Sequence, residues 1–169
     1  MEQLIIHGGA GSLEGKLAEA QVMHDSLCNI WEESFVLLKK GSAEETVRHA
    51  IRMLEDDPVF NAGTGSKLQA DGQVRMSSAL MDGTKNRFSG VINVQNIRNP
   101  IEAAALLSKE ENTVLSADQA TEFCRRNGMA DYDPITPERL EEYERRCSGK
   151  HGTVGAVALD KEGHIFAAT

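Results

Sequence analysis

The chain has 169 residues, of which 40% are hydrophobic and 26% are charged, and it carries a formal net charge of −8. This length suits one domain that buries roughly two-thirds of its unfolded surface. Lysine and arginine never cluster beyond a dipeptide, which argues against a nucleic-acid-binding protein. No apolar run approaches the roughly 20 residues of a membrane span.

The cysteines and the N-terminus indicate the compartment. Cys28, Cys124 and Cys147 lie far apart, which favours reduced thiols over a disulfide framework or a zinc site. The first residues lack a basic segment followed by a long apolar run, so we expect no secretory signal. We therefore expect a soluble, cytoplasmic protein.

The first part of the chain begins with a strand and continues with two helices. An apolar run over residues 4–6 stops at a group of glycines, which predicts a short strand. Apolar residues at helical spacing predict a helix over about 16–40. Ser42 and Glu45 form a capping box for a second helix, which ends before Pro58.

The second part adds strands, two helices and a final hairpin. Asp71-Gly72 is typical of a hairpin turn, and Ser116 with Gln119 resembles a second capping box. The charged stretch over 136–146 is either a short exposed helix or a mobile linker. The expected order is strands over 73–81 and 87–94, helices over 100–108 and 116–127, and strands over 152–160 and 164–169. Such an order predicts an α/β (α+β) fold.

Four short motifs follow one another in a fixed order. They are His7-Gly8-Gly9-Ala10-Gly11, the run LEDDPVFNAGTG over 54–65, Ala79-Leu80-Met81-Asp82-Gly83, and Gly152-Thr153-Val154-Gly155. Each motif is weak alone, but the ordered set resembles the plant-type asparaginases, also called isoaspartyl peptidases, over nearly the whole chain. The resemblance implies the four-layer αββα sandwich of N-terminal-nucleophile hydrolases, incomplete in this chain.

The resemblance implies that Thr153 is a nucleophile released by self-cleavage. A threonine hydroxyl is unreactive without a base, but a freed α-amine on the same residue can accept its proton. Gly152 supplies the scissile carbonyl, and glycine tolerates the strained backbone that this attack requires. The alternative is that Thr153 is an ordinary residue at the start of a strand.

The motif over 54–65 resembles the sodium-binding loop of this family. The ligands that the resemblance implies are backbone carbonyls, and hard cations prefer such oxygen ligands. They belong to Leu54, Glu55, Asp57, Phe60, Ala62 and Thr64. A plain connection without an ion is the alternative for this loop.

Three further residues are candidates near the site. Asn61 either supports the nucleophile and the scissile carbonyl, as the resemblance implies, or stabilises its own turn. Gly8 and Gly9 either let the backbone pass close to the active centre or make a simple tight turn. His7 is expected to be structural, and a role for His151 in self-cleavage is a weak hypothesis.

The chain departs from the family pattern in two places. Ser77-Ser78-Ala79 stands where the family often has an acidic residue. The chain also stops at Thr169, before the substrate-holding arginine and aspartate and the second threonine that family members carry, so we expect this segment alone to be inactive.

These observations predict an autoprocessing amidohydrolase that cleaves L-asparagine and β-aspartyl peptides. Residues 1–152 would be the α-subunit, with a linker at about 131–150, and 153–169 would be the first β-subunit hairpin. The expected partners are a small amide or β-aspartyl dipeptide substrate and the remaining β-subunit, in an (αβ)2 assembly without organic cofactor, nucleic acid or membrane. The alternatives are a glycosylasparaginase-like or taspase-like relative, or a non-catalytic scaffold.

Overall fold

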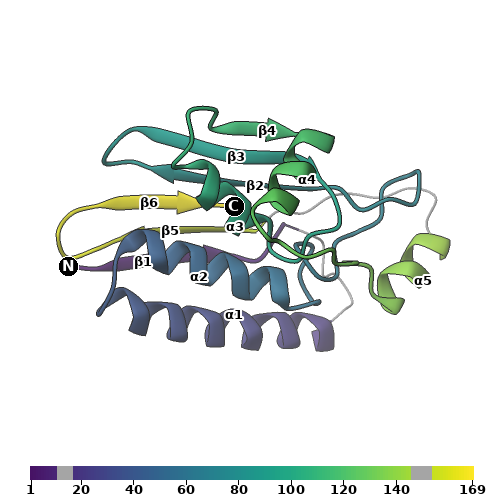
Figure 1. The fold of residues 1–169 in the computed structure, drawn as a ribbon. Coiled ribbons are helices and arrows are strands. Elements are labelled where there is room, and N and C mark those ends of the chain that lie inside the picture. The colour runs from purple at the N-terminus through teal and green to yellow at the C-terminus, as the bar shows by residue number, and fades with distance from the viewer. Residues whose placement is uncertain (11–16, 146–153) are drawn as a thin grey trace.

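One mixed sheet organises the chain (Figure 1). The computed structural model describes residues 1–10, 17–145 and 154–169. In chain order its elements are β1 (Gln3–His7), α1 (Leu17–Leu38), α2 (Ala43–Asp56), β2 (Met76–Asp82), β3 (Arg87–Val94), α3 (Pro100–Leu107), β4 (Val114–Ser116), α4 (Ala117–Arg126), α5 (Pro137–Arg145), β5 (Gly155–Leu159) and β6 (Ile165–Ala168). The strand order is β1-β5-β6-β2-β3-β4, and only the β3–β4 pair is parallel. The predicted α+β class is confirmed.

Both sides of the predicted cleavage point contribute strands to this one sheet. β5 and β6, which follow position 153, lie between β1 and β2. β5 pairs with β1 over five residues, from Gln3↔Leu159 to His7↔Gly155. The expected hairpin over 153–169 is therefore a central part of the sheet and completes the core that residues 1–145 begin.

Helix α2 forms as its sequence predicts. Glu45 N–H donates to the Ser42 hydroxyl at 3.2 Å, and Ser42 N–H donates to the Glu45 carboxylate at 3.1 Å, which completes the capping box. The apolar side of the helix is fully buried and consists of Val47, Ala50, Ile51 and Leu54. This side packs with β5 and β6, while α1 lies alongside α2 and contacts the edge strand β1 (Figure 1).

Helices α3 and α4 extend the same layer over the other end of the sheet. Val91 of β3 is buried with Leu107 of α3 and Cys124 of α4 in a second apolar cluster. Ser89 Oγ donates to the Ala104 carbonyl at 2.8 Å, which ties β3 to α3. Among the described helices, none has the length and apolar character that crossing a membrane requires.

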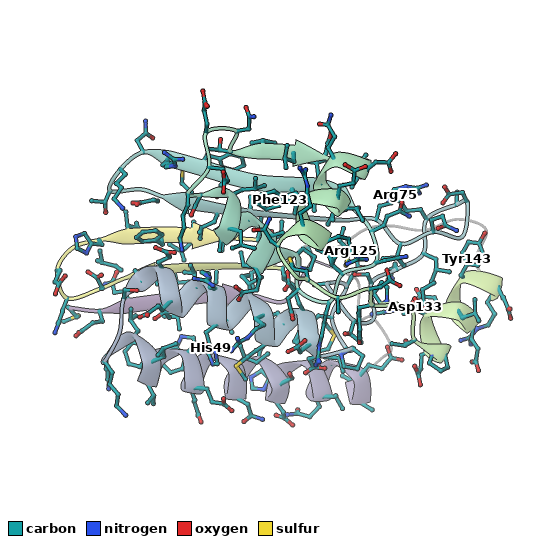
Figure 2. The ribbon with its side chains drawn as sticks, viewed as in Figure 1. His49, Arg75, Phe123, Arg125, Asp133 and Tyr143 are labelled. Atoms are coloured by element: carbon teal, nitrogen blue, oxygen red, sulfur yellow. The ribbon has the colours of Figure 1, made fainter. Side chains whose placement is uncertain are left out.

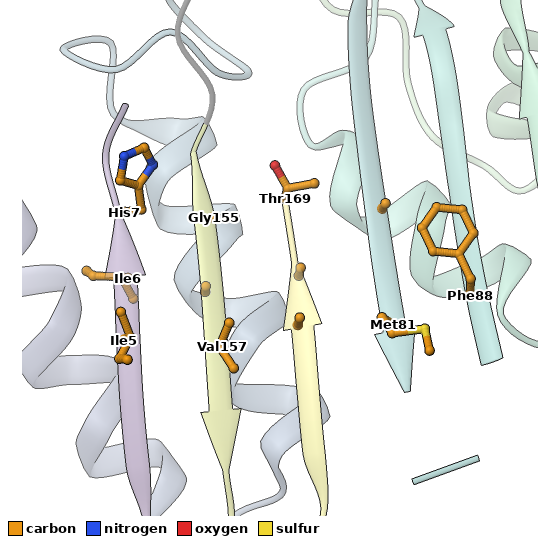
Figure 3. A pocket seen from close by; sticks show the side chains of 12 residues that line it. Ile5, Ile6, His7, Met81, Phe88, Gly155, Val157 and Thr169 are labelled. Atoms are coloured by element: carbon orange, nitrogen blue, oxygen red, sulfur yellow. The ribbon is translucent and has the colours of Figure 1, made fainter. Parts of the chain in front are cut away.

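The opposite face of the sheet carries an apolar row. Ile5, Val157, Ala167, Met81 and Phe88 are successive cross-strand partners over five strands (Figure 3). Direct partners point to the same face of a sheet. Ile5 is 72% exposed and Phe88 is 50% exposed, because no helix of the described residues covers this face. One sheet with helices on one face is consistent with half of the expected αββα sandwich.

Several local expectations differ from the structure. The strand expected over 73–81 begins only at Met76, because Gln69 N–H bonds the Gln73 carbonyl in the preceding turn. The second capping box is wrong, because the Ser116 side chain makes no cap hydrogen bond. The charged stretch forms α5 over Pro137–Arg145, the helical alternative, and Arg146 lies outside the described residues.

Candidate active site

The end of β1, the start of β5 and the end of β6 lie together at one end of the sheet, and β5 closely follows the predicted nucleophile in sequence. Thr153 and Gly152 themselves lie outside the described residues, as does His151. Val154, the next residue, is 6% exposed, and its carbonyl accepts the Thr169 hydroxyl. His7 and Gly155 are strand partners, and Figure 3 shows His7, Gly155 and Thr169 at the same end of the sheet.

Gly8 and Gly9 have different structural reasons for lacking a side chain. A Cβ atom on Gly8 would lie 2.7 Å from Cε1 of Phe60. Gly9 has a φ of +114°, which side-chain-bearing residues rarely adopt. Gly8 therefore permits a close approach to Phe60 in the loop after α2, and Gly9 permits a turn.

The loop after α2 is closed at its base. Thr64 N–H donates to the Glu55 carbonyl at 2.7 Å. Gly63 sits against the same residue with a φ of +49°, and a Cβ there would lie 2.2 Å from the Glu55 oxygen. The closure brings together two of the predicted sodium ligands, Glu55 and Thr64, from opposite ends of the loop.

The loop carbonyls are compatible with a monovalent cation. Three of the six predicted ligands already accept one hydrogen bond each: Glu55 from Thr64 N–H, Asp57 from Phe60 N–H, and Phe60 from the Arg139 guanidinium. A carbonyl oxygen has two lone pairs, so each of these can still face a cation. The Phe60 oxygen also contacts the positive charge of the Arg139 guanidinium.

Glu55, whose main-chain carbonyl is a predicted sodium ligand, also carries a buried carboxyl group that the sequence did not predict. Its side chain is 3% exposed, and Oε1 accepts Ile101 N–H at 3.0 Å. Oε2 is buried without a hydrogen-bond partner among the described residues. Burial raises the pKa of the Glu55 carboxyl well above its ordinary value. An acidic residue at a helix end resembles a solvated one in sequence, so no local signal predicts this burial.

Asn61 has the local role that one interpretation predicted. Its Oδ1 accepts the backbone N–H of Lys67 at 2.7 Å, which fixes the side-chain amide within its own loop. The same residue also lines a cleft of about 290 Å³. With the oxygen engaged, the amide nitrogen is the end of the side chain that donates hydrogen bonds. The turn role is therefore present in the structure.

The cleft connects the loop with the strand that follows position 153. Its lining is mainly polar and comprises Glu55, Asn61, Ala62, Gly63, Ser66, Lys67, Gln69, Arg75, Met76, Ser77, Asn93, Pro100, Val154 and Thr169. Val154 and Asn61 come from opposite ends of the chain, so the fold brings two of the four motifs together. Its hydrogen-bond donors suit a polar ligand with carbonyl or carboxylate oxygens.

The cleft includes two cationic residues that sequence reasoning missed. Lys67 Nζ lies 2.9 Å from Glu142, and Arg75 Nη2 lies 2.8 Å from Asp71. Figure 2 shows Arg75 and Tyr143 at the end of the molecule where α5 lies. Lys67 stands in a turn-rich stretch and Arg75 in a segment expected as a strand, so only the tertiary structure reveals that both line one cleft.

His7 is not part of this cleft. It lines an apolar groove on the open face of the sheet together with Ile5, Val157 and Phe88 (Figure 3). Cys28 and Cys124 are free thiols, as predicted, and Cys147 lies outside the described residues.

Comparison with known proteins identifies the family. A family model described as asparaginase matches residues 1–149. An alignment of 189 positions with an isoaspartyl peptidase/L-asparaginase of Synechocystis sp. shows 41% identity and covers 99% of this chain and 56% of the relative. The chain is 35% identical over 188 residues to a plant-type L-asparaginase of Pyrococcus horikoshii, covering 96% and 60%. It is 35% identical over 194 residues to an isoaspartyl peptidase of Salmonella typhimurium, covering 98% and 61%.

The matches cover nearly the whole chain and include the two loops described above. The chain spans 56 to 61% of the length of these three relatives, and the matches cover nearly all of its own residues. The glycine turn after β1 and the closed loop after α2 lie inside the region that the family model matches. The chain belongs to the asparaginase family.

Proposed function

We propose that the protein is an autoprocessing hydrolase that cleaves the side-chain amide of L-asparagine and the isoaspartyl bond of β-aspartyl peptides. Three relatives from different organisms are named for these activities. The observation that carries the proposal is the cleft that Asn61 and Val154 share, because it joins the loop motif to the residue after the predicted nucleophile.

In the proposed mechanism, Thr153 is both nucleophile and base. Self-cleavage after Gly152 frees the Thr153 amine, whose ordinary pKa of about 7.7–8.0 suits proton transfer near neutral pH. The hydroxyl attacks the substrate carbonyl, an acyl-enzyme forms and ammonia or the amino group of the next residue leaves, and water then releases aspartate. The amide nitrogen of Asn61 donates a hydrogen bond to the threonine or to the carbonyl oxygen under attack.

A sodium ion would stiffen the loop that carries Asn61. The carbonyls of Leu54, Glu55, Asp57, Phe60, Ala62 and Thr64 would hold it, and the closure between Thr64 and Glu55 supports this assignment. The ion would take no part in the chemistry. Thermal unfolding at equal ionic strength in sodium, potassium and choline chloride tests it, since a bound cation raises Tm with its own concentration. Equal Tm values in the three salts would remove the ion from the account.

The assembly and compartment complete the proposal. The remaining β-subunit would cover the open sheet face and supply the groups that hold the substrate, within an (αβ)2 enzyme. The exposed apolar row through Ile5 and Phe88 supports a further layer on this face. A cytoplasmic location is supported by the free thiols of Cys28 and Cys124, and no organic cofactor is required.

A substrate comparison separates this function from its rivals. Purified protein from the full-length gene should release leucine from β-aspartyl-leucine and ammonia from asparagine, and it should leave N-glycosyl-asparagine intact. Preferred cleavage of N-glycosyl-asparagine would instead support a glycosylasparaginase-like enzyme. No hydrolysis of any of the three, with a correctly folded protein, would favour the scaffold.

A further inference from the structure

Helix α5 stands apart from the sheet (Figure 1). None of its residues is fully buried, so apolar packing does not explain its position. Its polar side chains instead reach the loop and the turn that carry Asn61, Lys67 and Ala70. Tyr143, for example, donates its hydroxyl hydrogen to the Ala70 carbonyl at 3.1 Å.

Arg139 of α5 makes the central contacts of this attachment. Its Nε donates to the Gly65 carbonyl at 2.5 Å, and Nη2 donates to the Phe60 carbonyl at 3.3 Å. Its third nitrogen, Nη1, lies 2.8 Å from a carboxylate oxygen of Glu142. The side chain is only 17% exposed. A planar guanidinium can hold several acceptors in a fixed geometry, which a lysine cannot do.

The two carbonyls that Arg139 holds, those of Phe60 and Gly65, lie on either side of the segment 61–64 in the loop after α2. The Phe60 carbonyl belongs to the peptide group that leads into Asn61, so Arg139 fixes the plane of that peptide. The Gly65 carbonyl lies at the other end of the turn. One charged side chain therefore sets the separation of the two ends of the segment that presents Asn61.

A second set of contacts leads from α5 to the Asn61 side chain. Glu142 accepts from Arg139 and also holds Lys67 Nζ at 2.9 Å. The backbone N–H of Lys67 then donates to Asn61 Oδ1 at 2.7 Å. Both the main chain and the side-chain amide of Asn61 are thus positioned by groups that depend on Arg139.

The segment before α5 is attached to the same loop. Gly65 N–H donates to the Pro134 carbonyl at 2.8 Å, and the hydroxyls of Tyr132 and Thr64 lie 2.8 Å apart. The stretch over 132–143, which the sequence left open as a mobile linker, therefore contacts the loop at several points.

We propose that Arg139 is a positioning residue for Asn61, and that α5 acts as a strap that holds the Phe60–Gly65 turn in the geometry the reaction requires. This inference rests on the proposed function only for the part that Asn61 plays in catalysis. The attachment itself depends only on the contacts above.

The test compares Arg139→Ala with Arg145→Ala in the full-length protein. Arg145 lies on the same helix, is 74% exposed and pairs only with its helical neighbour Glu141 among the contacts described here. Amide hydrogen exchange of Lys67 reports directly on the bond to Asn61, and Glu45 N–H in α2 reports on the rest of the fold. Arg139→Ala should speed exchange at Lys67 about tenfold, the effect of losing a hydrogen bond to a charged group. Arg145→Ala should leave the Lys67 rate unchanged.

Two further measurements separate positioning from general destabilisation. Millimolar guanidinium should restore slow exchange at Lys67 in the Arg139→Ala variant. In the Arg139→Lys variant, exchange at Lys67 should be intermediate between the wild-type and Arg139→Ala rates. Turnover of β-aspartyl-leucine by Arg139→Ala should show a kcat lowered about tenfold with little change in KM, because the substrate-holding groups are untouched. Guanidinium should raise this kcat again.

Several results would overturn the inference. Unchanged exchange at Lys67, or equal acceleration at Lys67 and Glu45, would show that Arg139 does not hold the loop specifically. Faster exchange with an unchanged kcat would show that the loop position does not matter for turnover. A wild-type protein that shows no turnover contradicts the proposed function instead, and the exchange data still decide whether the strap exists.

Discussion

Replacing Gly63 with alanine should destabilise the protein far more than the same change at Gly128. Both glycines have positive φ angles, +49° and +80°, so both variants lose the conformational freedom that glycine provides. They differ in their surroundings. A Cβ at position 63 would lie 2.2 Å from the Glu55 carbonyl oxygen and 2.6 Å from its Cβ, whereas nothing lies within 4 Å at position 128.

The expected magnitudes follow from these two terms. A non-glycine residue in the left-handed region costs about 1–2 kcal/mol, and both variants bear this cost. Forcing an extra methyl group into an occupied space costs a further 1–3 kcal/mol or so, and only Gly63→Ala bears it. The overlap is with the carbonyl oxygen, Cα and Cβ of Glu55, which move only with the main chain, so it can be relieved only by opening the Thr64–Glu55 closure.

Urea unfolding of both variants measures the difference. The free energy of unfolding of Gly63→Ala should fall by about 1–3 kcal/mol more than that of Gly128→Ala, with similar m values. Equal losses in the two variants would show that the loop base is not closed as described. Such a result would also remove the geometric support for the cation site.

Two other predictions concern single side chains. Ser42→Ala should lower the free energy of unfolding by about 1 kcal/mol, because it removes the capping box of α2, and Ser116→Ala should have little effect, because that serine makes no cap bond. Burial raises the pKa of the Cys124 thiol from 9.0 to about 11. Between these two pH values the thiol is ionised in the unfolded chain but protonated in the folded protein, so the free energy of unfolding falls as pH rises. Urea unfolding from pH 8 to 11 should show a smaller decline in Cys124→Ala, and equal declines would contradict the burial.

The elements that could be predicted from sequence are those that local interactions specify. The capping box and apolar periodicity of α2 act within one helix, and both agree with the structure. Strand β3 has the predicted bounds of Arg87 to Val94. Ser116 and Gln119 match a capping pattern, but Ala117 enters α4 with a φ of +49°, so the regular cap geometry does not form.

The site could be predicted only as far as its motifs extend. The glycine turn and the loop after α2 stood out because their motifs resemble those of a known family, and their glycines mark unusual backbone. Lys67, Arg75 and Arg139 carried no such signal, since charged residues usually lie on solvated surfaces. Their contacts join residues far apart in the chain, from Phe60 to Arg139 and from Lys67 to Glu142. Such contacts depend on the tertiary fold, which a local pattern does not contain.

The central claim is that the amide before Thr153 is broken and that the exposed amine activates the hydroxyl. Intact mass and N-terminal sequencing of the purified full-length gene product test it directly. The account predicts two chains, one of which begins at Thr153, and a single uncut chain for Thr153→Ala. A wild-type protein that remains one chain, or a new N-terminus at any other residue, would contradict it.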